Sequence, residues 1–280
     1  MKIARYEKRP PFRKRALRML KWAALALGLS GAALGLWLYL TPPPAGFPIL
    51  EYHMVRDDLP DKEAYDYAVP LEDFRQQLDY LREQGYETIT LLEYMKAKKG
   101  KFTLPEKPIV LTFDDGYDDN YTNLLPLLEE RGMKAVVFMV TNDIGRPGYL
   151  TWEQLRDMEK RGIELGSHTA NHQPLTTLDE NKREEELKLS KLLMEWNGLK
   201  TIFSFSYPNG AYDEKLPPLL KENEYLAAVT GEAGLNDMST DPYLLHRINI
   251  PRPHLGLWEF KARLLKGELL AKLGWNKHEI

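Results

Sequence analysis

The sequence predicts an α/β fold in which about seven parallel strands close into a barrel, preceded by one N-terminal transmembrane helix. Short apolar runs alternate with segments of helical period between residues 47 and 230. Such alternation is typical of right-handed βαβ units and a parallel sheet. Groups of polar residues directly follow several predicted strands, which is where barrels of this kind carry their sites. A 19-residue stretch without charge near the N-terminus predicts the membrane helix.

The uncharged stretch, residues 22–40, would be about 28 Å long as a helix, close to the hydrocarbon thickness of a bilayer. Residues 1–21 carry nine Lys and Arg against one Glu, and such a basic segment is expected to remain in the cytoplasm. A cleaved signal peptide is the alternative, but the small residues lie inside the apolar run rather than after it. We therefore expect an uncleaved signal anchor in the cell membrane, with the main domain outside the cytoplasm. Residues 41–46 form a Pro-rich linker.

Composition excludes several classes of function. The 280 residues contain no Cys, which excludes disulfides, thiolate metal ligands and cysteine nucleophiles. The net charge is −3, but residues 1–21 contribute +8 and the remainder therefore −11. Because the basic part lies beside the apolar segment, it indicates a membrane flank and no nucleic-acid partner. The hydrophobic content of 43% is enough for one buried core, and we expect a monomer.

The predicted elements follow the linker in a regular order. Strands are expected over 47–55, 86–91, 108–111, 135–140, 163–165, 201–207, 226–230 and 247–250. Helices are expected over 71–84, 92–98, 120–131, 151–160, 179–196 and 213–223. Thr151 has the character of an N-cap residue. The last stretch, 253–280, is predicted to be an amphipathic helix packed on the barrel, although it could instead lie on the membrane surface.

Two adjacent carboxylates follow the strand at 108–111. Asp114 and Asp115 belong to the sequence Thr-Phe-Asp-Asp-Gly at 112–116, and neighbours on a strand point in different directions unless the chain turns. Gly116 supplies such a turn, so one Asp can hold a cation while the other stays available to take a proton. The alternative is an Asx-turn with two solvated carboxylates.

A second polar group follows the strand at 163–165. Its sequence, Ser-His-Thr-Ala-Asn-His, places His168 and His172 four residues apart, the spacing that brings two side chains to one side of a helical turn. With Asp115 they make a three-ligand site that leaves positions open for water and substrate, the catalytic rather than the structural pattern for a divalent metal. A lone His pair is more often incidental, but the two groups together favour a metal site.

The pieces TFDDG, SHTANH and FSYPNG, in this order, resemble the polysaccharide deacetylases of carbohydrate esterase family 4, the NodB-homology domain. The resemblance covers most of the chain after the linker and implies a distorted (β/α)7 barrel, so we assign residues 47–252 to the catalytic domain. It also implies that Asp114 is the general base beside the metal. The opening ILEYHMV at 49–55 is most similar to the subgroup that acts on poly-N-acetylglucosamine.

Hydrolysis of an amide also calls for a general acid, because the leaving amine must be protonated, and His is the usual choice near neutral pH. His53 is the first candidate, since the subgroup places its acid in this YHxV pattern. His246 is the second, because Leu-Leu-His matches the LxH motif that supplies the acid in other members. Either residue could instead be a hydrogen-bonded core histidine.

Residues 206–210, Ser-Tyr-Pro-Asn-Gly, occupy the place of the family's Arg-x-Pro-Tyr-Gly. The resemblance therefore implies that Tyr207, Pro208 and Asn209 bind substrate, with the backbone N–H of Asn209 directed at the oxyanion. Ser206 stands where the family has the Arg that steadies the base. The family's Asp-x-x-Asp-Trp motif is not evident either, and both departures fit the poly-N-acetylglucosamine subgroup.

We therefore expect a metal-dependent hydrolase that removes N-acetyl groups from a polysaccharide containing N-acetylglucosamine, with exopolysaccharide ahead of cell-wall peptidoglycan. One alternative is an O-acetyl esterase acting on xylan or a similar glycan. Another is an inactive glycan-binding protein, against which the second carboxylate, Asp114, argues. Zinc is the first expectation for the metal, with cobalt, nickel and iron as alternatives, because Asp-His-His suits several metals.

Overall fold

The computed structural model describes residues 12–41, 46–59, 65–273 and 277–278. The chain divides into two compact units, Met1–Pro44 and Ala45–Ile280. In the first unit, α1 (Phe12–Leu40) is one continuous helix. It begins at Phe12 rather than at Trp22, because the Arg, Lys and Leu residues before the apolar span are themselves good helix formers.

Within α1, the part Ala16–Trp37 is long and apolar enough to cross a membrane. A signal sequence near the N-terminus has the same length and composition. The helix is therefore an apolar segment that can serve as a signal or as an anchor.

The second unit is built around a parallel sheet with the strand order β11-β1-β5-β6-β7-β8-β9. The strands are β1 (Ile49–Tyr52), β5 (Pro108–Phe113), β6 (Val136–Met139), β7 (Glu164–Ser167), β8 (Ser204–Ser206), β9 (Ala227–Val229) and β11 (Ile248–Asn249). Val229, at the end of β9, forms a further parallel bridge with Leu245 shortly before β11. This bridge brings the two edges of the sheet together and confirms the predicted α/β fold with a parallel, barrel-like sheet.

Side chains alternate between the two faces of these strands, which divides the core into two parts. One cluster fills the barrel interior together with α3 (Leu91–Lys98) and includes Ile49, Val110, Val136, Val229 and Leu245. The other cluster lies between the strands and the outer helices and includes Leu50, Leu111, Val137 and Ala228. Continuing the alternation along β1 and β5 places Glu51 and Asp114 on the interior side, at the carboxyl end of the barrel.

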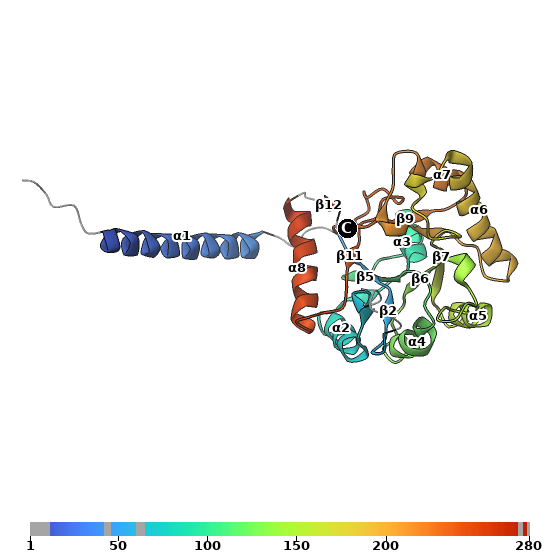
Figure 1. The fold of residues 1–280 in the computed structure, drawn as a ribbon, viewed down its shortest axis with the longest axis horizontal. Coiled ribbons are helices and arrows are strands. Elements are labelled where there is room, and N and C mark those ends of the chain that lie inside the picture. The colour runs from blue at the N-terminus through green and yellow to red at the C-terminus, as the bar shows by residue number, and fades with distance from the viewer. Residues whose placement is uncertain (1–11, 42–45, 60–64, 274–276, 279–280) are drawn as a thin grey trace, which may run out of the picture. The chain divides into compact units, whose positions relative to one another are not determined.

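Helices cover the outside of the sheet (Figure 1). They are α2 (Leu71–Glu83), α4 (Leu125–Glu129), α5 (Trp152–Lys160), α6 (Glu180–Trp196) and α7 (Leu216–Glu222). Thr151 caps α5 as predicted, because its side chain accepts the Gln154 N–H while the Gln154 side chain accepts the N–H of Thr151. Asp179 caps α6 in a similar way by accepting the N–H of Lys182.

Two predicted elements are interrupted near the carboxyl end of the barrel. The strand expected over 47–55 breaks after Tyr52, because β2 (Met54–Val55) leaves the barrel and pairs with β3 (Ala68–Val69). His53 therefore lies at the end of β1. The helix expected over 120–131 begins with a turn of π-helix at Asn120–Leu124, and Pro126 just after it has no N–H to close an α-helical turn.

Besides β2 and β3, three short strands among the described residues lie outside the barrel order. β4 (Glu87–Thr88) pairs with the beginning of β5, within the strand predicted over 86–91. β10 (Glu232–Ala233) pairs antiparallel with β12 (Lys277–His278).

The C-terminal helix α8 (Leu257–Leu273) packs on the barrel. Its buried residues are Phe260, Leu264 and Gly267. The Phe260 ring contacts the ring of Tyr80 in α2 edge-on, with 6.1 Å between centroids. A side chain at Gly267 would collide with Ile248 of β11, since an added Cβ would lie 2.4 Å from its Cδ1. These contacts hold α8 against α2 and β11, while Trp258 remains 77% exposed.

Candidate active site

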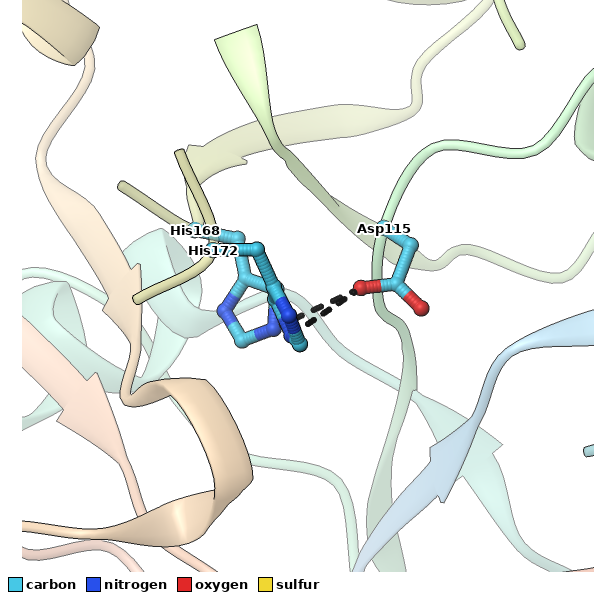
Figure 2. A group of neighbouring side chains, drawn as sticks. All are labelled: Asp115, His168 and His172. Atoms are coloured by element: carbon cyan, nitrogen blue, oxygen red, sulfur yellow. Dashed lines mark ion pairs between the residues drawn. The ribbon is translucent and has the colours of Figure 1, made fainter. Parts of the chain in front are cut away.

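Three predicted metal ligands come together at the carboxyl end of the barrel. Asp115 is the second residue after the end of β5, and His168 directly follows β7. The Asp115 Oδ1 lies 3.6 Å from His168 Nε2 and 3.4 Å from His172 Nε2. Figure 2 shows both imidazoles directed at the same carboxylate oxygen.

These separations fit a bound metal ion. Tetrahedral ligands at about 2.0–2.2 Å from zinc lie about 3.3–3.6 Å from one another, which matches the two Asp115–imidazole distances. The side chain of His168 is 2% exposed, whereas that of His172 is 40% exposed. The cluster is therefore open on the His172 side, where substrate and water can enter.

The His segment is held by a strained loop rather than by the helical turn that the four-residue spacing predicts. Thr169 and His172 both adopt positive φ angles, 69° and 55°. Glu186 of α6 stabilises this loop by accepting the N–H groups of Ala170 and Asn171. The two imidazoles nevertheless meet, with 4.8 Å between ring centroids. Asp115 is also in the left-handed region, with φ of 72°, and such backbone strain is common at functional sites.

Ser206 orients His168, the buried member of the three predicted ligands. The Nδ1 of His168 lies 2.7 Å from the carbonyl oxygen of Ser206, so it is the donor in this contact and Nε2 faces Asp115. Burial lowers the pKa of His168, against the opposing effect of Asp114 and Asp115. The neutral imidazole that a metal requires is therefore favoured at this position.

Asp114 lies at the edge of the cluster and is almost fully buried, at 2% exposure. Its Oδ2 is 3.9 Å from His168 Nε2 and accepts a hydrogen bond of 3.0 Å from the Ser206 hydroxyl. Its Oδ1 accepts a hydrogen bond of 2.9 Å from Nη1 of Arg247. Burial alone would raise the pKa of Asp114, but the positive charge and the hydrogen bond of Arg247 lower it below its ordinary value. Asp114 is therefore ionised near neutral pH, as a general base must be.

Arg247 and Glu51 are two site residues that the sequence patterns did not identify. Arg247 is 1% exposed, and its guanidinium bonds Asp114 through Nη1 and Glu51 Oε1 through Nη2, at 2.9 and 3.0 Å. It also donates through Nε to the carbonyl oxygen of Thr230. The signal in the sequence is a charged residue in each of two predicted strands, Glu51 within 47–55 and Arg247 at the start of 247–250, a pattern that indicates a paired charge in the interior.

Arg247 thus supplies a guanidinium to the base where Ser206 has replaced the family's Arg. It reaches Asp114 from the position just before β11 rather than from the end of β8. Ser206 adds its own hydroxyl to the same carboxylate. The departure noted in the sequence therefore leaves the base with a charged partner.

The two candidate acids occupy different surroundings. A ring nitrogen of His53 lies within 4.8 Å of carboxylate oxygens of both Glu51 and Asp114. Its ring lies against that of Tyr67, with 4.9 Å between centroids. His246 lies next to Arg247 in sequence, and its Nδ1 is 3.6 Å from Glu232 Oε2. Of the two histidines, only His53 lies in the group that contains Asp114.

The loop after β8 holds Asn209 at the surface. Asn209 adopts a left-handed conformation, with φ of 56° and ψ of 20°, and its side chain is exposed. Pro208 is buried, and the side chain of Tyr207 is fully buried and donates its hydroxyl to the carbonyl oxygen of Tyr243. The Tyr207 ring therefore packs in the core, so any contact of this loop with substrate falls to Asn209 and to the backbone.

Comparison with known proteins identifies the family. The family model for polysaccharide deacetylase matches residues 101–228. YxkH of Bacillus subtilis (strain 168), whose name assigns it to the polysaccharide deacetylases, is 33% identical over 210 residues, covering 75% of this chain and 73% of YxkH. This chain belongs to the polysaccharide deacetylase family. The match of the family model includes both metal-ligand groups and Asp114 but not His53 or Arg247.

Other relatives and solved structures of polysaccharide deacetylases agree with this assignment. The poly-β-1,6-N-acetyl-D-glucosamine N-deacetylase of Staphylococcus epidermidis is 28% identical over 224 residues, covering 71% of this chain and 77% of the relative. The enzyme of the same name from Escherichia coli O157:H7 is 33% identical over 251 residues, or 84% of this chain. The aligned region is only 34% of that longer protein.

Among solved structures, the Streptococcus pyogenes deacetylase PplD in complex with acetate superposes with a TM-score of 0.72 at 26% identity, covering 80% of this chain and 99% of PplD. IcaB from Ammonifex degensii gives a TM-score of 0.63 at 28% identity, covering 73% and 91% of the two chains. The deacetylase fold is therefore present along nearly the full length of both solved chains.

Proposed function

We propose that this polysaccharide deacetylase removes N-acetyl groups from an N-acetylglucosamine polymer, with exopolysaccharide ahead of peptidoglycan, and that it releases acetate. The observation that carries the proposal is the position of Asp114. This second carboxylate lies beside the three-ligand cluster and is held ionised by Arg247. A protein that only bound glycan or metal would have no need for a buried base at this place.

Asp115, His168 and His172 would hold the divalent metal, and zinc is our first choice. When bound there, a divalent metal supplies Lewis-acid polarisation of the acetyl carbonyl and lowers the pKa of water. Asp114 takes a proton from the attacking water, which forms the new C–O bond at the acetyl carbon. We assign to the backbone N–H of Asn209 the role of donor to the oxygen that gains charge. The exposed, left-handed position of Asn209 after β8 supports this role.

The C–N bond breaks as His53 gives a proton to the nitrogen, so the amine leaves neutral and the acetyl group leaves as acetate. We prefer His53 to His246 for this step because its ring nitrogen lies within 4.8 Å of the Asp114 carboxylate. Base and acid are then on the same side of the barrel. The printed names of the relatives from Staphylococcus epidermidis and Escherichia coli support an N-acetylglucosamine polymer as substrate.

We further propose that α1 is an uncleaved signal anchor and that the catalytic unit lies outside the cytoplasm. The basic residues before the apolar span support this orientation. Because the chain has no Cys, a single Cys at the exposed position of Thr201 can be labelled selectively. A membrane-impermeant maleimide should label Thr201→Cys in intact cells, in a product that retains residues 1–40. Labelling only after lysis, or loss of these residues, would contradict the proposal.

The substrate proposal is tested by acetate release from three substrates with the full chain in detergent. They are β-1,6-linked N-acetylglucosamine oligomers, peptidoglycan and acetylated xylan, each with added zinc and with chelator. Chelator-sensitive release from the β-1,6-linked oligomers is expected to be fastest. Release from xylan alone would indicate an O-acetyl esterase. Glycan binding without acetate release, across several metals, would indicate an inactive protein and contradict the proposal.

A further inference from the structure

Glu51 is a largely buried carboxylate that has no role in the reaction proposed above. It belongs to β1 and precedes His53 by two residues, so the regular alternation of a strand directs both side chains to the barrel interior. The Glu51 side chain is 15% exposed. A buried carboxylate needs a paired charge, and Arg247 supplies one at 3.0 Å.

The position of Glu51 places it beside the candidate acid as well as beside the arginine. A carboxylate oxygen of Glu51 lies within 4.8 Å of a ring nitrogen of His53 and of an oxygen of Asp114. Arg247 bonds both carboxylates through separate nitrogens, Nη1 to Asp114 and Nη2 to Glu51. The fork of one guanidinium therefore fixes the separation of the two carboxylates.

The charges around His53 indicate how the carboxylate of Glu51 affects a proton on this imidazole. Its ring nitrogen lies within 4.8 Å of carboxylate oxygens of Glu51 and Asp114, and its ring lies against that of Tyr67 from the segment before β3. Arg247, just before β11, bonds both carboxylates. Together with the predicted ligand Asp115, the three carboxylates and one guanidinium carry a formal charge of −2, which a bound divalent cation would neutralise. Without Glu51 the loaded site would already be positive, and a proton on His53 would add to that charge. With Glu51 the metal-loaded site has no net charge before His53 takes a proton, so the protonated imidazole costs less.

We propose that Glu51 is a positioning residue that holds the protonated imidazole of His53 toward the departing amine. This inference rests on the proposed function. In the step that it serves, the proton of His53 moves to the amine nitrogen as the C–N bond breaks, and the C–N electron pair remains on nitrogen. Burial raises the pKa of Glu51, and the positive charge of Arg247 opposes this effect. The step uses Glu51 in its ionised form throughout.

The test compares two substrates that differ in their need for an acid. The amide of an N-acetylglucosamine oligomer requires protonation of its amine, whereas the nitrophenolate of 4-nitrophenyl acetate leaves as a stable anion. Both reactions use Asp114 and the metal ligands. In the full chain loaded with zinc, Glu51→Gln is expected to lower kcat for the oligomer by about 10- to 100-fold. It should change kcat for the ester by less than about twofold, with KM and bound zinc unchanged in both cases.

Glu232→Gln is the matched control, because Glu232 also lies beside a histidine, at 3.6 Å from His246. It should leave both substrates unaffected. In a His53→Ala background the effect of Glu51→Gln on the oligomer should disappear, since both residues then serve one step. Glu51→Asp, which keeps the charge, should recover part of the lost rate.

Several outcomes would overturn the inference. Equal losses on oligomer and ester would show that Glu51 acts through Arg247 and Asp114, or on the fold. Full activity of Glu51→Gln on both substrates would show that its charge has no role. A selective loss in Glu232→Gln would identify His246 as the acid. If the wild-type chain hydrolyses the ester but releases no acetate from any N-acetylated glycan, the proposed function itself fails, and the inference with it.

Discussion

Replacing Arg247 with Met would remove the one guanidinium that bonds both Asp114 and Glu51. Met has a similar length and fills most of the space, so the change tests the charge more than the packing. Both carboxylates would remain in the barrel interior without their partner. The expected result is a large loss of stability that depends strongly on pH.

The size of the expected loss of stability follows from the burial of the ion pair between Arg247 and Asp114. Arg247 and Asp114 are 1% and 2% exposed, and removal of one partner of a buried ion pair typically costs about 3–5 kcal/mol. For a domain of this size, 1 kcal/mol shifts Tm by about 2–4 °C, so Tm should fall by about 10 °C. The folded-state pKa of Asp114 is lowered in the wild type, so its contribution is present above its ordinary pKa and is lost as pH falls.

In Arg247→Met the carboxylates have no positive partner, so burial raises their pKa values and folding becomes less favourable as pH rises. The difference in stability between wild type and variant should therefore be largest near pH 8 and narrow toward pH 5. Urea unfolding of the full chain in detergent, with chelator present and followed by Trp fluorescence, measures this difference.

Arg161→Met is a suitable control, because Arg161 pairs with Glu129 and Asp157 but is 33% exposed. It should cost less than about 1 kcal/mol at either pH. The double variant Arg247→Met with Glu51→Gln should recover part of the loss, since it removes one of the two unpaired charges. Equal stabilities of Arg247→Met and Arg161→Met near pH 8 would refute the view that Arg247 neutralises the interior carboxylates.

Two further predictions concern stability away from this ion pair. Burial raises the pKa of Glu164 to about 7, although it accepts bonds from the Leu92 N–H and the Ser204 hydroxyl. Wild-type stability should therefore fall by up to about 3 kcal/mol as pH rises from about 4.5 to 7, and urea midpoints of Glu164→Gln should lack this fall. An unchanged slope would contradict the assignment to Glu164. Gly116→Ala should lose about 1–2 kcal/mol in thermal unfolding, because φ at this position is 79°. An added Cβ would also lie 2.2 Å from Cε of Met139. Met139→Ala in the same chain removes that contact but not the backbone strain, so it should not restore the lost stability. Full stability of Gly116→Ala would show that the turn tolerates a side chain.

Local signals predicted most of the elements that carry the site. The apolar run before Asp114 and the capping residue Thr151 act over a few residues, so their pattern is visible in the sequence and the structure agrees. The order of the Asp and His groups, each directly after a strand, also predicted that Asp115, His168 and His172 would meet. This follows because carboxyl ends of parallel strands lie at one end of the sheet.

Other features depend on contacts between distant parts of the chain. Arg247 meets Asp114 across 133 positions of sequence, and only closure of the barrel through β11 brings them together. The four-residue spacing of His168 and His172 suggested a helical turn, but Glu186 of α6 holds the segment as a left-handed loop. In the same way, pairing of β2 with β3 interrupts the strand predicted over 47–55, so that β1 ends at Tyr52.

The most direct test of the central claim is a side-by-side measurement of bound zinc and acetate release in Asp114→Asn and Asp115→Asn. Asp114 is proposed as the base and Asp115 as a ligand, although they are neighbours in sequence. Asp114→Asn should bind zinc like the wild type and lose about 10²- to 10⁴-fold in kcat on N-acetylglucosamine oligomers. Asp115→Asn should lose zinc and activity together. Equal loss of zinc in both variants, or near-normal acetate release by Asp114→Asn, would contradict the assignment of Asp114 as the base.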